Sequence, residues 1–270
     1  MNEGREQEAA DAPQEIASEV DPTILLYSLG LDFDIEAQLA AIHDLLKRNR
    51  EGAAETAEVI KSAEDRAHRL QGDLNEWAVD DLVDQIHHSA YQATAHSMAA
   101  VGMLAPLVET VFSQCFAKIG ELLYDEADPP NSHKRWTARR QKHKWDCHFF
   151  VDDHRFEKGI AKGIAQLLDA LGLACRVPSD LEQTLTALFA YRNAMFHGGF
   201  EWPLHDREEF VENIVKQCPS DWFIVGTTGN DPWLICMSET FIQRVLWSIE
   251  QVLQILAWFI HENRPPEPTV

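Results

Sequence analysis

An arginine, an amide and a histidine lie within six residues of one another in this sequence, at Arg192, Asn193 and His197. A guanidinium can hold two phosphate oxygens at once, and an imidazole can take up or release a proton near neutral pH. Together they indicate a site that handles phosphate groups. The same residues also allow a structural role, in which Arg192 pairs with a buried carboxylate and His197 caps a helix end.

A helix over residues 181–199 is predicted to position these three side chains. Ser179 begins a Ser-x-x-Glu capping box, and two glycines follow the last apolar residue. At helical spacing the apolar residues fall on one stripe, with Arg192 in its middle. Asn193 and His197 are four positions apart and share the flank of that stripe. The residues of the stripe are Leu181, Leu185, Leu188, Phe189 and Phe196.

The segment from Arg192 to His197, RNAMFH, resembles the R-x4-H signature of the HEPN superfamily in its common form, with a polar residue after the arginine and Gly-Gly after the histidine. The resemblance implies a helical bundle that often dimerises through the motif helices. Many members are metal-independent endoribonucleases, and others have lost activity and serve as binding or dimerisation modules. The toxin branch with a tyrosine two residues after the histidine is not matched, because Gly199 stands there.

An acidic residue is expected to face the motif from another helix. Residues 97–125 predict a long amphipathic helix, and Glu109 lies on the flank of its apolar stripe. Early helices of HEPN bundles often carry one such acid, so the resemblance makes Glu109 a candidate to orient Arg192 or His197. The alternative is an exposed glutamate on the surface.

Two functions follow from the motif and the resemblance. The first is an RNA-cleaving enzyme in which the 2′-hydroxyl attacks the adjacent phosphorus at a site shared by two protomers. His197 would act as general base or acid, Arg192 would stabilise charge on the phosphate, and Asn193 would hold the phosphate or the imidazole. The second is a non-catalytic module that binds a nucleotide or a regulatory protein partner. Either one suits a toxin–antitoxin or defence system.

A cation-rich segment at residues 133–145 is a candidate surface for single-stranded RNA. Cations bind phosphates, and indole rings stack on unpaired bases. The segment could instead neutralise the acidic surface of the protein itself or bind an acidic partner. The candidate RNA-binding residues are Lys134, Arg135, Trp136, Arg139, Arg140, Lys142, Lys144 and Trp145.

The overall charge of the chain limits how it can bind RNA. The 270 residues carry a net charge of −21, which argues against sequence-blind binding of nucleic acid. The five cysteines are scattered and include no C-x2-C pair, so the pattern favours a reducing, cytoplasmic setting. The N-terminus has no apolar signal segment, and residues 90–108, although free of formal charges, contain polar residues typical of a buried helix. No membrane association is expected.

A metal-dependent hydrolase is a third, weaker alternative. His148, Asp152, Asp153 and His154 are residue types that bind divalent metals, but their spacing matches no known ligand pattern. The sequence also contains no nucleotide-binding glycine motif. No metal and no cofactor are therefore expected.

The fold class predicted from these patterns is all-α, an up-and-down helical bundle of HEPN type. Heptad spacing over residues 34–77 predicts a long coiled-coil-like helix, or two helices broken near Gly52, that pairs within its own chain or across a dimer. We expect this helix to contribute to dimerisation or partner docking. Residues 222–225 and 233–236 predict a small β-hairpin. The expected divisions are an acidic tail at 1–22, a helical arm at 23–95, the bundle at 96–264 and a tail at 265–270.

Overall fold

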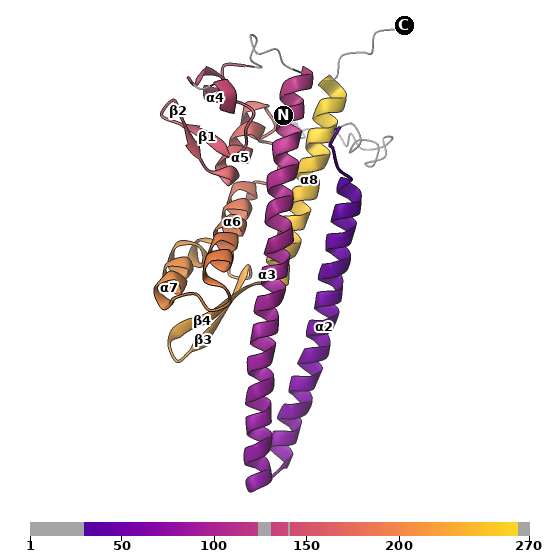
Figure 1. Cartoon of the computed structure of the whole chain (residues 1–270), viewed down its shortest axis with the longest axis vertical. Coiled ribbons are helices and arrows are strands. Elements are labelled where there is room, and N and C mark those ends of the chain that lie inside the picture. The colour runs from indigo at the N-terminus through magenta and orange to yellow at the C-terminus, as the bar shows by residue number, and fades with distance from the viewer. Residues whose placement is uncertain (1–29, 124–130, 140, 264–270) are drawn as a thin grey trace, which may run out of the picture.

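The protein is mostly helical, as predicted. The computed structural model describes residues 30–123, 131–139 and 141–263, and these form seven α-helices and two antiparallel β-hairpins. The predicted tails at 1–22 and 265–270 lie outside the described residues. Figure 1 shows two long helices side by side, α2 (Ile35–Arg69) and α3 (Asp73–Leu123), with the smaller elements gathered along one side of α3.

The two long helices pair within the chain. The connection after α2 is short, and Gly72 in it has a φ of 64°, a left-handed conformation that suits glycine. Of the two predicted alternatives, one long helix or a break near Gly52, the structure shows no break, since α2 continues through Gly52. Of the amphipathic helix predicted over residues 97–125, residues 97–123 belong to the longer helix α3, which begins at Asp73 and continues through Pro106. The ring of Pro106 is exposed, so it does not disturb the core packing on either side.

The α2–α3 pair has a packed end and a free end. Leu39, Ile42 and Leu46 are buried where α2 meets the rest of the bundle. Towards the free end (residues 53–86) the buried apolar residues are alanines, Ala63, Ala67 and Ala78. Leu74 and Trp77, predicted to continue the heptad seam, are 63% and 59% exposed, because α2 ends at Arg69 and the chain reverses before them.

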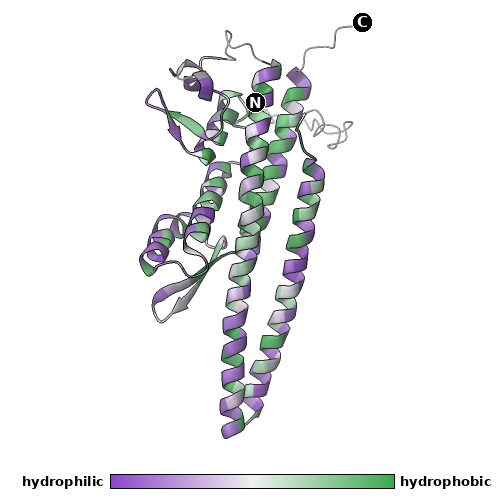
Figure 2. Cartoon of the chain, viewed as in Figure 1, coloured by the Kyte–Doolittle hydropathy of each residue, from purple (hydrophilic) through white to green (hydrophobic). Residues whose placement is uncertain are grey.

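The core lies where α3, α6 (Leu181–Gly198) and α8 (Glu239–Asn263) meet. α8 is apolar on most of its surface, and Figure 2 shows green along it and along the half of α3 beside it. Within the described residues one helix, Asp73–Leu122, is long and apolar enough to cross a membrane by length and composition alone. Of its most apolar window, 56% is buried inside the protein, as expected of a core helix.

Two hairpins and several short elements lie along α3. β3 (Phe223–Thr228) pairs with β4 (Asp231–Met237), which confirms the predicted hairpin. A second hairpin, β1 (Phe149–Asp152) with β2 (Arg155–Lys158), was not predicted. Its two turn residues, Asp153 and His154, have φ values of 41° and 65°, as a tight two-residue hairpin turn requires. The remaining elements are α4 (Lys134–Thr137), α5 (Ile160–Ala170), α7 (Leu204–Asn213) and two 3-10 turns at Gln141–His143 and Val215–Gln217.

Candidate functional site

The helix α6 carries the motif, but its buried face differs from the predicted stripe. Tyr191 and Met195 are fully buried, and the Tyr191 hydroxyl donates a hydrogen bond to the Ile235 carbonyl in β4. Arg192 therefore lies at the edge of the core face, with its side chain 40% exposed. The residue before the helix is Asp180, not Ser179, and its side chain makes no capping hydrogen bond. Asp180 instead pairs with Arg244 of α8.

A chain of polar side chains extends from Arg192 across three segments. The Arg192 guanidinium lies 3.9 Å from one Glu109 carboxylate oxygen on α3, and the other Glu109 oxygen lies 3.1 Å from Nε2 of His148. The Nδ1 atom of His148 lies 2.8 Å from a carboxylate oxygen of Asp146. Arg192 also donates a hydrogen bond of 3.2 Å to Oδ1 of Asn193. Four functional side chains are thus linked to the motif arginine.

This network borders a cavity of about 500 Å³ at the protein surface. The polar residues Glu109, His148, Lys158, Arg192 and Asn193 form part of its wall. The rest of the wall is apolar: Phe149, Ile160 and Phe189. A cavity of this size, with a few converging polar groups beside aromatic surface, is typical of a small-ligand site.

The charge of Asp146 is stabilised within the network. Burial alone would raise the pKa of Asp146, but hydrogen bonds from the backbone N–H and the ring of His148, with a weaker one from His143, hold this pKa below its ordinary value. The Asp146 carboxylate therefore stays ionised at neutral pH. It orients the imidazole of His148 and leaves Nε2 facing Glu109.

The predicted catalytic residues are not all brought together. Arg192 and Asn193 line the cavity, and Glu109 lies beside Arg192. His197 is exposed at the end of α6, does not line this cavity, and makes no hydrogen bond or ion pair with any described residue. Phe196, next to it, is 56% exposed.

Sequence reasoning considered His148 only as a weak metal ligand. Its place beside Glu109 depends on the unpredicted β1–β2 hairpin, which leaves His148, the residue just before β1, facing α3. The only local signal was Asp146, two residues earlier, which is a frequent partner for a functional histidine. Asp152 and His154, grouped with His148 in the metal alternative, are exposed at the far turn of the hairpin. Among the described residues, no group of three or more His, Cys, Asp or Glu side chains could hold a metal ion.

Arg135, predicted to contact RNA, is instead the most deeply buried cation among the residues that the structure describes. None of its surface is exposed. Its guanidinium donates hydrogen bonds to residues 143–149 and so fixes the segment that leads into β1. Burial lowers the pKa of Arg135 to about 10, which still leaves it charged at neutral pH. The acceptors are the carbonyl oxygens of His143, Lys144, Asp146 and Phe149 and the side chain of Gln166.

The two tryptophans of the cation-rich segment pack inside the protein. Trp136 is 4% exposed, its ring lies 4.7 Å from that of Trp145, and its indole N–H donates to Asn131. Trp145 is half-buried against Gly120 of α3. The RNA-contact prediction is therefore wrong for Arg135 and Trp136, because a solvent-inaccessible side chain cannot reach a ligand.

The exposed part of the cation-rich segment is smaller than the sequence indicated. Lys134, Arg139 and Lys142 are exposed and Lys144 is half-buried. Arg140 lies outside the described residues. Three exposed cations in nine positions still form a local basic surface in an otherwise acidic protein.

Comparison of the chain with protein-family models, with curated proteins and with solved structures gives no match.

Proposed function

We propose that this protein is a metal-independent endoribonuclease of HEPN type, and that the cavity beside Arg192 binds the scissile phosphodiester. The observation that carries the proposal is that Arg192 and His148 both approach one carboxylate, Glu109, at the wall of one cavity. A phosphate entering this cavity meets a cation, an amide and an imidazole. A cytoplasmic setting, and a role in a toxin–antitoxin or defence system, belong to the same proposal.

In the proposed reaction, the RNA 2′-hydroxyl attacks the adjacent phosphorus, and the bond between phosphorus and the 5′-oxygen breaks. His148, in its neutral form with Nδ1–H donating to Asp146, accepts the proton of the hydroxyl at Nε2, where the hydroxyl takes the place of the Glu109 carboxylate. Arg192 stabilises the negative charge that develops on the non-bridging phosphate oxygens. Asn193 accepts a hydrogen bond from Arg192 through Oδ1, so its amide nitrogen can donate to the phosphate. The products are a 2′,3′-cyclic phosphate and a 5′-hydroxyl.

The leaving 5′-oxygen needs a proton, and we assign its delivery to His197 of the partner subunit in a homodimer. His197 is exposed and unpaired among the described residues, at the end of the motif helix. The apolar side chains Phe196 and Phe200, which flank it, are 56% and 37% exposed. Exposed aromatic rings at one place are a common feature of protein interfaces. A two-fold contact here would bring each His197 towards the opposite motif helix.

Single-stranded RNA is the substrate that the surroundings of the cavity fit best. Phe149 and Phe189 supply aromatic surface at the cavity wall, where an unpaired base can pack. Lys158 lines the same cavity, and Lys134, Arg139 and Lys142 are exposed on the preceding segment. Because the chain is strongly acidic, these cations are expected to guide the phosphate backbone locally.

The test is cleavage of single-stranded RNA in the presence of EDTA, with analysis of the product ends. Wild-type protein should leave 2′,3′-cyclic phosphates, and Arg192→Ala should lose about 100-fold or more in rate. The matched control is Arg176→Ala, because Arg176 is also about half exposed, at 45%, and also lies 3.9 Å from a glutamate, Glu262. Equal activity in the two variants would refute the assignment of Arg192.

A second candidate function is a non-catalytic module that binds a protein partner. The observation that favours it is the bare apolar face on the free end of the α2–α3 pair. Val79, Val83 and Ile86 are 41%, 43% and 47% exposed and lie on one helix face. Towards the bundle, Trp233 of β4 packs on His87 of α3, but nothing described covers the face beyond it. Figure 1 shows this end of the pair extending past all other elements.

The two functions give different results in one set of measurements. A non-catalytic module would leave RNA intact under single-turnover conditions, whereas the ribonuclease would cleave it. An Ile86→Asp variant should keep the circular dichroism spectrum and thermal unfolding of the wild type, since Ile86 is exposed. It should retain RNA cleavage if the enzyme proposal is correct, and it should lose partner binding if the module proposal is correct.

A further inference from the structure

A second cavity lies between α2 and α3, away from the motif helix. Its volume is about 400 Å³, and it shares no lining residue with the cavity beside Arg192. Gly52, Ala53, Ala93 and Ala99 leave the space open, since larger side chains at these positions would fill it. The other lining residues are Arg48, Asn49, Thr56, Ser89, Gln92, Ala95 and His96.

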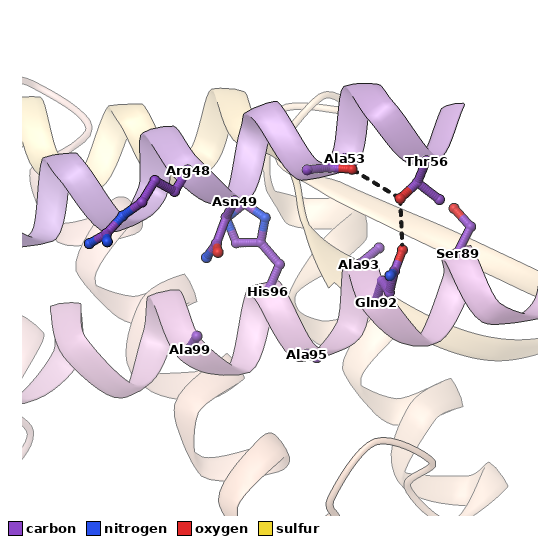
Figure 3. A pocket seen from close by; sticks show the side chains of 11 residues that line it. Arg48, Asn49, Ala53, Thr56, Ser89, Gln92, Ala93, Ala95, His96 and Ala99 are labelled. Carbon is purple, nitrogen blue, oxygen red and sulfur yellow. Dashed lines mark hydrogen bonds between the residues drawn. The ribbon is translucent and has the colours of Figure 1, made fainter. Parts of the chain in front are cut away.

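Several polar groups around this cavity lack a protein partner. Nε2 of His96 is buried and makes no hydrogen bond. Such a group is costly to bury unless a ligand or water satisfies it. Figure 3 shows His96 reaching from α3 towards Asn49 on α2, while the Arg48 side chain starts beside Asn49 and extends along α2 away from His96. Asn49 makes no side-chain hydrogen bond with a described residue, and Arg48 donates only its Nε hydrogen, to the Asp44 carbonyl, which leaves its terminal amino groups available.

The opposite end of the cavity is closed by a side-chain bridge between the helices. The Thr56 hydroxyl lies 3.0 Å from Oε1 of Gln92 and 2.9 Å from the Gly52 carbonyl. Because Oε1 of Gln92 accepts from Thr56, the amide nitrogen of Gln92 remains as a donor. Residues with donor groups therefore line the cavity on both helices.

The cavity wall contains no carboxylate, although the chain has 44 acidic residues and 23 basic ones. Burial lowers the pKa of His96; Arg50 lowers it further, while Glu239 opposes the shift. His96 is therefore neutral at neutral pH and keeps one ring N–H. The charge at the wall comes from Arg48, whose planar guanidinium matches two oxygens of an anion.

We propose that this cavity binds a small anion that carries a carboxylate or phosphate group, held by Arg48, Asn49 and His96. The anionic group of the ligand lies at the end of the cavity nearer the bundle. The rest of the ligand, a small organic molecule, extends along the cavity towards Gln92. Both groups present the same recognition chemistry, paired anionic oxygens facing N–H donors. Binding joins α2 to α3 and so stabilises the folded protein.

The test is thermal unfolding of the full chain with inorganic phosphate and, separately, succinate, each at constant ionic strength. At about ten times the dissociation constant, the better probe should raise the Tm by about 3 °C. Arg48→Ala should abolish this shift. Ala93→Leu, which fills the cavity and removes no polar group, should abolish it too, and calorimetric titration of either variant should show no binding heat. Circular dichroism checks that each variant is folded.

Arg69→Ala is the matched control. Arg69 is also exposed on α2 and also donates its Nε hydrogen to the carbonyl four residues earlier, but it lies outside the cavity. This variant should keep the full shift. A phosphate response without a succinate response identifies a phosphate ligand, and the reverse identifies a carboxylate. The proposal is overturned if neither probe raises the Tm, or if Arg48→Ala and Arg69→Ala respond alike.

Discussion

The imidazole of His148 lies 3.1 Å from the carboxylate of Glu109, although 39 positions separate them in the chain. The same carboxylate lies 3.9 Å from the guanidinium of Arg192 on a third segment. The histidine that shares this carboxylate with the motif arginine therefore lies just before β1, and not on the motif helix itself. Within one protomer, the enzyme hypothesis therefore depends on His148, and no longer on His197, for proton transfer.

Replacement of His148 by alanine should lower RNA cleavage by about 100-fold to 10,000-fold, because it removes the proposed proton acceptor at the cavity wall. Single-turnover rates with a short fluorescent RNA measure this effect. His88→Ala is the control, since His88 is an exposed histidine of α3 that does not line the cavity beside Arg192. An unchanged rate in His148→Ala would remove His148 from the mechanism.

Replacement of Arg135 by methionine should lower the free energy of unfolding by about 3–5 kcal/mol. The variant leaves buried carbonyl groups without their donor, and such groups are costly to desolvate. Urea unfolding followed by tryptophan fluorescence provides the measurement. Arg139→Met, four positions along the same segment but exposed, should change this free energy by less than about 0.5 kcal/mol. Similar losses in the two variants would contradict the structural role of Arg135.

The stabilising effect of Asp146 should depend on pH. Its folded-state pKa lies below the ordinary value of 3.8, so the ionised carboxylate stabilises the fold above that value, and the stabilisation is lost as the pH falls through the folded-state pKa. The difference in unfolding free energy between wild type and Asp146→Asn should therefore be constant from pH 7 to about pH 5 and shrink below about pH 4.

Urea unfolding at a series of pH values tests the dependence on Asp146. Asp84→Asn serves as the control, because the exposed Asp84 side chain makes no hydrogen bond or ion pair with a described residue. It should alter stability little at any pH. If the difference in unfolding free energy between wild type and Asp146→Asn grew as the pH falls, the stabilising role of the ionised Asp146 carboxylate would be contradicted.

Replacement of Gly163 by alanine should destabilise the contact between α5 and the start of β1. An added Cβ would lie 2.0 Å from the Cys147 carbonyl oxygen, which is backbone and cannot rotate away. We expect a loss of about 2–4 kcal/mol in unfolding free energy, measured by urea unfolding. Gly52→Ala has open space around the added carbon and should instead stabilise α2 by about 0.5–1 kcal/mol. Equal effects at the two glycines would contradict the close approach.

Local patterns in the sequence predicted long helices in the regions of α2 and α3, the motif helix α6 and one of the hairpins. Helical periodicity identified α6, and the two short β-prone runs around residues 226–232 identified the β3–β4 hairpin. These elements follow from properties of neighbouring residues, namely the period of apolar positions and the turn residues between them. The types and spacing of Arg192, Asn193 and His197 were sufficient to single out the end of α6 as the candidate site.

Tertiary structure decided the partners and exposure of those side chains. The sequence showed charge at residues 134–144, but only packing decided that Arg135 is buried as a structural donor while Arg139 is exposed. Likewise, Glu109 and His148 meet because the β1–β2 hairpin folds against α3. The physical reason is that periodicity describes one element at a time, whereas burial and hydrogen bonding depend on segments far apart in the chain.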